Sequence, residues 1–235
     1  MKKTIHRANT RGAANHGWLK SYHTFSFASY QNPERMNFGM LRVLNDDLVQ
    51  PKMGFGTHPH KNMEIISIPL SGALSHKDSL NNKRSIEVGE VQVMSAGTGV
   101  SHSEFNDSST DAVNFLQLWI IPEIENGTPY YNQKMFEAVG RKNRFQTLVS
   151  PRRNQVEGSL PINQQAFISM IDLEEGFTAE YMLKNAAYFF LIEGKVAIDD
   201  VTLERRDAVG ITAANKASIT ANSSSKLLVI DVPYI

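Results

Sequence analysis

The hydrophobic positions of the chain fall into short runs, and several of these runs alternate with a period of two. In the run at residues 91–94, Val-Gln-Val-Met, apolar and polar side chains alternate over the first three positions, and the runs at 63–70 and 114–121 are rich in β-branched and aromatic residues. Gly72 and Pro122 follow these two runs, as turn residues do at the ends of strands. Turn residues recur about every eight to twelve positions, a spacing typical of sandwiches and barrels. Because long amphipathic helix patterns are scarce, the sequence predicts an all-β fold.

A second strand-rich block follows at residues 188–198 and 226–233. The stretch between the two blocks, residues 122–151, is polar and irregular, which is typical of a connection between domains. Within it we expect a short helical piece at residues 135–139.

The two blocks resemble each other as a diverged internal repeat. Gly54-Phe55 precedes an apolar run that ends at Gly72, and Gly176-Phe177 precedes one that ends at Gly194 with the same spacing. We therefore predict two domains, residues 1–140 and residues 141–235.

The composition narrows the classes of function. Lys plus Arg and Asp plus Glu number 24 each, so the net charge is zero, and no basic surplus favours nucleic acid or an anionic membrane surface. The absence of cysteine excludes disulfides, thiolate metal sites and cysteine nucleophiles. Neither a signal sequence nor an apolar segment of about eighteen residues is evident. We expect a soluble, cytoplasmic protein.

The candidate chemistry lies in two pairs of residues, His58-x-His60 and His102-x-Glu104. Residues i and i+2 of a strand point to the same face, so each pair offers two ligands side by side. Two strands of one barrel could thus direct three imidazoles and a carboxylate to one point, a set that suits Fe, Mn, Co, Ni, Cu or Zn. An isolated His-x-His is as often a solvated surface pair, but the second pair favours a metal site. Glu64 is a rival ligand, or an acceptor that orients an imidazole.

Longer motifs around these pairs resemble those of a known family. Gly54-x-Gly56-Thr57-His58-x-His60-x-x-x-Glu64, followed by Gly72, resembles the first metal-binding motif of cupins. Gly89, Ser95-Ala96-Gly97 and His102-x-x-x-Asn106 resemble the second motif. The carboxylate of Glu104 and the runs at residues 12–19, 23–28 and 42–47 are similar to those of the pirin family within the cupins. The resemblance is dense over residues 5–122 and looser beyond.

The resemblance implies a bicupin, with two stacked double-stranded β-helix barrels in one chain. It implies one divalent metal in the N-terminal barrel, bound by His58, His60, His102 and Glu104, with iron expected first and Mn, Co, Ni, Cu or Zn also compatible. Glu64 would then be an outer-shell residue. The remaining histidines are interpreted as structural: His6, His16, His23 and His76.

The resemblance also implies an activity. Bacterial pirins resemble quercetin 2,3-dioxygenases, which open the central ring of flavonols with dioxygen, and Glu104 would be the catalytic base. The expected partners are a small planar aromatic substrate and dioxygen, in a monomer. An aromatic cavity could include Phe38, Met40, Phe55 and Phe105. The alternative is a non-enzymatic metal-binding regulatory protein that binds transcription factors or metabolic enzymes.

The C-terminal barrel is expected to hold no metal, because no histidine follows His102. Counting from the matched glycines sets His58 and His60 opposite Glu180 and Met182. Matching the later strands sets His102 and Glu104 near Ile219 and Ala221. One carboxylate, one thioether and two apolar side chains do not make a nitrogen-rich site.

Overall fold

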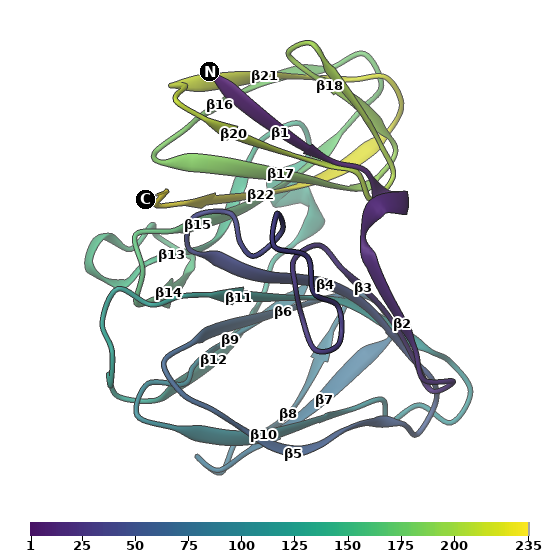
Figure 1. Cartoon of the computed structure of the whole chain (residues 1–235), viewed down its shortest axis with the longest axis vertical. Coiled ribbons are helices and arrows are strands. Elements are labelled where there is room, and N and C mark those ends of the chain that lie inside the picture. The colour runs from purple at the N-terminus through teal and green to yellow at the C-terminus, as the bar shows by residue number, and fades with distance from the viewer. Residues whose placement is uncertain (235) are drawn as a thin grey trace.

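The computed structural model describes residues 1–234 and contains four layered sheets (Figure 1). The lower half in Figure 1 pairs a seven-stranded with a four-stranded sheet. The larger sheet has the order β12 (Tyr130–Met135), β9 (Glu90–Ser95), β6 (Glu64–Ser71), β11 (Val113–Ile120), β4 (Leu41–Val49), β3 (Leu19–His23) and β2 (Gly12–Asn15). The smaller has the order β5 (Gly54–His60), β10 (Val100–Phe105), β7 (Ala73–Asp78) and β8 (Lys83–Glu87).

The upper half repeats this plan. Its seven-stranded sheet has the order β1 (Lys2–His6), β20 (Ala208–Thr212), β17 (Ala186–Glu193), β22 (Ser225–Val232), β15 (Phe167–Leu173), β13 (Gln146–Pro151) and β14 (Leu160–Ile162). Its four-stranded sheet has the order β16 (Thr178–Met182), β21 (Lys216–Ala221), β18 (Lys195–Ile198) and β19 (Val201–Glu204). The predicted repeat is therefore present strand by strand, with β5 to β11 corresponding to β16 to β22.

The helices of the described residues are three short 3₁₀ turns, η1 (Ala8–Thr10), η2 (Ala138–Arg141) and η3 (Arg152–Asn154). The turn η2 begins three residues after the start of the predicted helical piece at 135–139. The expected linker is also more ordered than predicted, because β12 occupies residues 130–135 and pairs with β9. Within residues 1–234, no helix is long and apolar enough to span a bilayer.

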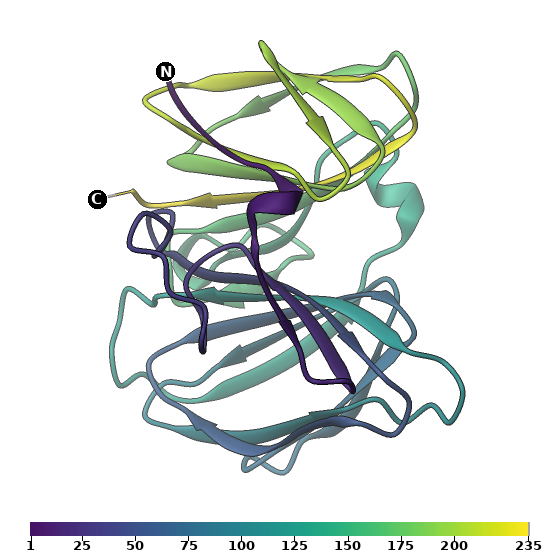
Figure 2. The ribbon, with the colours of Figure 1, turned by 45° about the vertical axis from the view of Figure 1, so that its right-hand side comes forward.

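The first strand crosses between the two halves of the molecule. β1 pairs with β20 of the C-terminal barrel, from Lys2 opposite Thr212 to His6 opposite Ala208. It occupies the edge that β12 occupies in the N-terminal sheet, and both views show the purple terminus on the yellow-green barrel (Figures 1 and 2). The predicted division of the chain near residue 140 stays a prediction. Residues 2–6 do not follow it, because they pair with a strand of the C-terminal barrel.

The two large sheets face each other across a shared apolar core (Figure 2). Ile66 and Ile68 of β6 pack in the same cluster as Tyr188 and Phe190 of β17. The interior of the C-terminal barrel is a second apolar cluster, made by residues such as Phe189. The interior of the N-terminal barrel has smaller apolar clusters, and its remaining inner positions are polar.

Candidate metal centre

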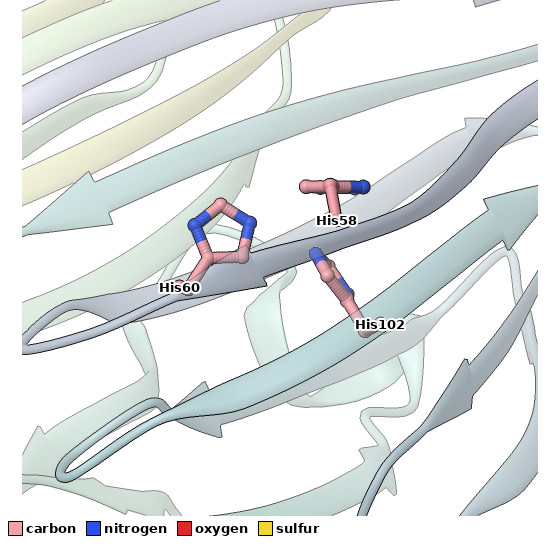
Figure 3. A group of neighbouring side chains, drawn as sticks. All are labelled: His58, His60 and His102. Atoms are coloured by element: carbon pink, nitrogen blue, oxygen red, sulfur yellow. The ribbon is translucent and has the colours of Figure 1, made fainter.

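The register of β5 and β10 brings the three histidines of the two motifs together. The strands are antiparallel, with His58 directly opposite His102 and His60 opposite Val100. The ring centroids of His58 and His102 are 4.5 Å apart, and each lies 4.9 Å from that of His60. One ring nitrogen from each histidine lies within 4.8 Å of the other two. Figure 3 shows the three rings turned toward one another from the two strands.

The hydrogen bonds around these rings leave nitrogens free for a metal ion. Nδ1 of His58 donates to the carbonyl oxygen of Gly56 at 2.8 Å, so its Nε2 carries a lone pair. His102 is buried, and neither of its ring nitrogens has a hydrogen-bond partner among the described residues. A buried polar atom without a partner is costly. A cation bound to one nitrogen of each ring would satisfy the lone pairs of His58 and His102 and reduce that cost, so the residues fit a metal site.

Burial also keeps two of the imidazoles, those of His60 and His102, in the neutral form that binds metals. Burial, together with the neighbouring His102 and His58, lowers the pKa of His60 to about 4. Burial lowers the pKa of His102 to about 3, with further contributions from His58 and His76. Both rings are therefore unprotonated at neutral pH.

Glu104 lies beside the histidines but is held by a different set of groups. A β-bulge between His102 and Glu104 shifts the register, so Glu104 lies opposite Phe55. The amide of Gln117 donates to both carboxylate oxygens of Glu104 at 3.0 Å, and the Ser67 hydroxyl donates to one at 3.3 Å. A carboxylate oxygen of Glu104 lies within 4.8 Å of ring nitrogens of His102 and His76.

The sequence interpretation missed the position of His76. This buried residue lies on β7 opposite Glu104, with its ring 5.3 Å from that of His102. Its Nε2 donates to Asp78 at 2.9 Å, which supports the structural role assigned to it. However, it also belongs to the polar cluster beneath the three histidines. The His76-x-Asp78 spacing on a strand was the available signal, because it sets both side chains on one face.

Glu64 points away from the metal centre. It shares a face of β6 with Ile66 and Ile68, which pack between the barrels. Its carboxylate accepts from Ser95 at 2.5 Å and from Asn163 at 3.3 Å. Among residues 1–234, no hydrogen bond joins Glu64 to an imidazole. The expectation that it orients a ligand fails because β5 and β6 belong to different sheets, so counting residues through the turn does not preserve the face.

A cavity of about 560 Å³ opens beside the histidines. His58, His60 and Glu104 line it, and its aromatic side chains are Trp18, Phe27, Phe55 and Trp119. Trp18 packs edge-to-face on Phe55 with centroids 5.3 Å apart, and Phe27 packs on Trp119 in the same way at 5.3 Å.

Three of the four expected cavity residues lie elsewhere. Phe55 lines the cavity as predicted. Phe38 is buried between the barrels, 5.3 Å from the ring of Tyr188, and Met40 packs against the same core. Phe105 is 37% exposed, because it alternates with the inward-facing Glu104. The strand pattern alone does not say which apolar face meets a cavity and which meets a second barrel.

The N-terminal segment forms part of the cavity wall. His16 and His23 both line the cavity, and Nδ1 of buried His23 has no hydrogen-bond partner among the described residues. The structural role expected for His23 is therefore not supported by a hydrogen bond at its Nδ1. His6 does have a structural role, since its Nδ1 lies 2.7 Å from the hydroxyl of Tyr188.

The corresponding positions of the C-terminal barrel differ by one residue from those expected. β16 and β21 pair without a bulge, with Ala179 opposite Ile219 and Tyr181 opposite Ala217. Since His102 matches Ile219, His58 matches Ala179 and His60 matches Tyr181. Glu180 is exposed and pairs with Lys216. The count from the glycines fails because the β5 bulge adds one residue. Ile219 and Ala221 are both buried.

Comparisons with known proteins agree with this architecture. A Pirin family profile matches residues 4–120, and a profile described as the quercetinase C-terminal cupin domain matches residues 147–232. A protein named quercetin 2,3-dioxygenase from Escherichia coli K12 is 43% identical, over 98% of this chain and 99% of the relative. A pirin-like protein from Caulobacter vibrioides is 40% identical, over 94% of this chain and 95% of the relative.

Solved structures show the same fold. The crystal structure of YhhW from Escherichia coli superimposes with a TM-score of 0.95 at 40% identity, covering 100% of this chain and 99% of that one. A structure titled bacterial pirin YhhW in complex with nickel(II) superimposes with a TM-score of 0.94 at 39% identity, over 100% of both chains. The fold is that of a bicupin. The chain belongs to the pirin family of the cupin superfamily.

Proposed function

We propose that this chain is a metal-dependent dioxygenase that opens the central ring of flavonols such as quercetin. The observation that carries the proposal is the convergence of three imidazoles, two of which line a large aromatic cavity. The full-length relative named quercetin 2,3-dioxygenase supports the same reaction class.

The proposed ligands of the metal are His58, His60, His102 and Glu104. The histidine nitrogens already converge, whereas Glu104 would exchange its contacts with Gln117 and Ser67 for the metal. The related pirin described with nickel(II) supports a divalent metal, and iron is the metal that we expect first. When bound, the metal would act as a Lewis acid that lowers the pKa of a ligated hydroxyl and orients the reactants.

Glu104 is proposed as the base that takes the proton of the flavonol 3-hydroxyl. It lines the cavity, so a substrate hydroxyl beside the histidines can come within hydrogen-bond reach of it. The Gln117 amide, which donates to both oxygens, would keep the carboxylate oriented before and after the transfer. In the overall reaction a flavonol and dioxygen become a depside and carbon monoxide.

The aromatic side of the cavity would bind the planar rings of the substrate. Trp18, Phe27, Phe55 and Trp119 present apolar surface and ring edges, which suit stacked or edge-to-face contacts with a flat ligand. Filling this cavity would also displace water from the imidazoles and from Glu104, which strengthens their electrostatic effect on the bound hydroxyl.

Metal-free protein reconstituted separately with Fe, Mn, Co, Ni and Cu tests the proposal. The measurement is loss of quercetin absorbance in air together with release of carbon monoxide, with the His102→Ala variant as control. We expect at least one metal to give turnover that the variant lacks. If every metal binds tightly and none supports turnover, the proposal is wrong, and the non-enzymatic regulatory role becomes the better interpretation.

A further inference from the structure

One side of the cavity is formed neither by the proposed metal ligands nor by the aromatic side chains. Four polar side chains form it: Ser21 and His23 on β3, and Asn45 and Asp47 on β4. The antiparallel register sets Ser21 opposite Asp47 and His23 opposite Asn45. Opposed residues, and residues two apart along a strand, share one face of a sheet. The four side chains therefore make a compact group, here called the polar wall.

Three members of the polar wall are buried with an unsatisfied polar atom. His23, Asn45 and Asp47 are 3%, 2% and 3% exposed. The atoms His23 Nδ1, Asn45 Oδ1 and Asp47 Oδ1 have no hydrogen-bond partner within residues 1–234. Leaving such atoms unpaired destabilises the fold, and apolar side chains at these positions would avoid that cost. Their gathering on the cavity side indicates that a ligand pairs with them.

The chemistry of these atoms specifies what the ligand must bring. Asn45 Oδ1 and Asp47 Oδ1 are hydrogen-bond acceptors without a partner among residues 1–234, and Ser21 lies directly opposite Asp47. The ligand must therefore supply donors, and an anionic ligand group is disfavoured beside two carboxyl groups, Asp47 and Glu104. A neutral hydroxyl group meets both requirements.

The polar wall adjoins the metal centre through Gln117. This residue lies directly opposite Asn45 in the pairing of β4 with β11, and its amide donates to Glu104 at 3.0 Å. All three residues line the same cavity. One flat ligand can therefore face Glu104 and the imidazoles with one hydroxyl and contact the polar wall with another.

We propose that the polar wall binds a second hydroxyl group of the substrate, so that the cavity selects polyhydroxylated planar aromatics over monohydroxylated ones of the same shape. This inference rests on the proposed function, which directs the first hydroxyl to Glu104 and the imidazoles. Asn45 and Asp47 are then specificity-determining residues.

Binding of two flavonols that share one ring skeleton tests the inference. Quercetin has hydroxyl groups besides that at position 3, and 3-hydroxyflavone has none. Both tryptophans of the chain, Trp18 and Trp119, line the cavity, so quenching of their fluorescence reports binding. The titration is done on metal-loaded protein without dioxygen, so no turnover is required. The variants are Asn45→Leu and Asp47→Leu, which keep the volume close to that of the native side chain.

We expect wild-type protein to bind quercetin about tenfold more tightly than 3-hydroxyflavone, the effect of one or two hydrogen bonds. Each variant should reduce this ratio to about threefold or less by weakening the binding of quercetin. Lys20→Ala is the matched control, because Lys20 is exposed on β3 and lies outside the cavity, and it should keep the wild-type ratio. If a leucine variant does not fold, Asn45→Ala with Asp47→Ala replaces it.

An equal affinity of wild-type protein for the two flavonols, or an unchanged ratio in the variants, would overturn the inference. The result is separable from the proposed function. Selective binding without turnover would refute the dioxygenase activity and leave the polar wall in place. Turnover of both flavonols with equal KM would refute the polar wall and leave the dioxygenase activity.

Discussion

At the scale of the residue, His102 is a side chain whose burial is costly without a metal ion. It is 1% exposed, and both ring nitrogens lack a hydrogen-bond partner among residues 1–234. His58, by contrast, has one nitrogen paired with Gly56. An imidazole buried without partners gains little from water or protein, so its role depends on a ligand.

The first prediction concerns metal content. Wild-type protein should bind one transition metal ion per chain, and a variant with both His58→Ala and His102→Ala should bind none, because one nitrogen and one carboxylate cannot hold the ion against water. Elemental analysis after dialysis measures this. His6→Ala is the control and should keep the metal, since His6 contacts Tyr188 away from the centre. One ion retained by the double variant would place the site elsewhere.

The second prediction separates two roles of Glu104. Glu104→Gln keeps the shape of the side chain but removes the negative charge and the ability to take a proton. We expect turnover at saturating metal to fall about 10²-fold or more, the contribution of a general base, with a smaller loss of metal affinity. Unchanged kcat at saturating metal would show that Glu104 is not the base.

The third prediction concerns pH and metal-free protein. Burial lowers the pKa of His60 to about 4 and that of His102 to about 3, from 6.5. As the pH falls, these histidines are therefore protonated in the unfolded chain before they are protonated in the folded chain. The rings stabilise the fold above pH 6.5, and this stabilisation is lost as the pH falls toward 4. Burial raises the pKa of Asp47 to about 7, which favours the fold at low pH and opposes the histidines.

Comparing the pH dependence of stability in wild type and in a His102 variant separates the effect of His102 from that of Asp47, which both proteins contain. Metal-free His102→Gln protein should lose less thermal stability than wild type between pH 6.5 and 4, because its glutamine does not titrate. Thermal midpoints across this range, measured by circular dichroism, check the prediction. Parallel curves for the two proteins would show that His102 titrates normally.

At the scale of the element, the contact of β5 with β10 sets the geometry of the metal centre. A Cβ at Gly54 would lie 2.3 Å from the carbonyl oxygen of Glu104, which belongs to the backbone of β10. A Cβ at Gly56, on the same strand, would meet no atom within 4 Å. Glycine is therefore required at the first position by the close approach of the strands.

The fourth prediction uses these two glycines as a matched pair. Gly54→Ala should push β5 from β10, with a loss of stability of about 1–3 kcal/mol, as in overpacked sites, and weaker metal binding. Gly56→Ala should change both quantities little. Denaturant unfolding and metal titration of the two variants provide the measurements. Equal effects in both variants would show that the spacing of the strands does not control the site.

At the scale of the whole molecule, a buried ion pair links the two barrels. Arg206 of the C-terminal barrel donates to Asp46 of β4 at 2.7 Å, and Arg11 lies 3.7 Å from the same carboxylate. Arg206 also donates to the side chain of Asn114 at 3.3 Å. Side chains of the pair are at most 9% exposed, so the charges depend on each other for compensation.

The fifth prediction is that Arg206→Met destabilises the protein by about 3 kcal/mol, as expected when a buried carboxylate loses its nearest charged partner. The double change Arg206→Met with Asp46→Asn should cost less than the sum of the single changes. Arg205→Met is the control, because Arg205 forms a more exposed pair with Glu193. Thermal and urea unfolding give the energies. Additive effects of the two single changes would mean that the pair is not coupled.

The sequence by itself determined the all-β fold, the repeat and the three histidines of the centre. Strand alternation and turn residues are local properties, so short windows report them well. His58 and His60 lie on one strand, and His102 and Glu104 lie on another, so the spacing within each pair identified them as candidate ligands. Bringing the two pairs together required only that the two strands be neighbours in one sheet.

Only the tertiary structure decided which face of each strand lines the cavity and which packs against the other barrel. Glu64 lies between the barrels, Phe38 lies in the shared core and His23 lies in the cavity. These positions depend on turns between sheets and on the packing of one barrel against another. A single bulge in β5 moved the matches of His58 and His60 in the C-terminal barrel by one residue, and such a shift reverses the face because side-chain direction alternates at each step along a strand.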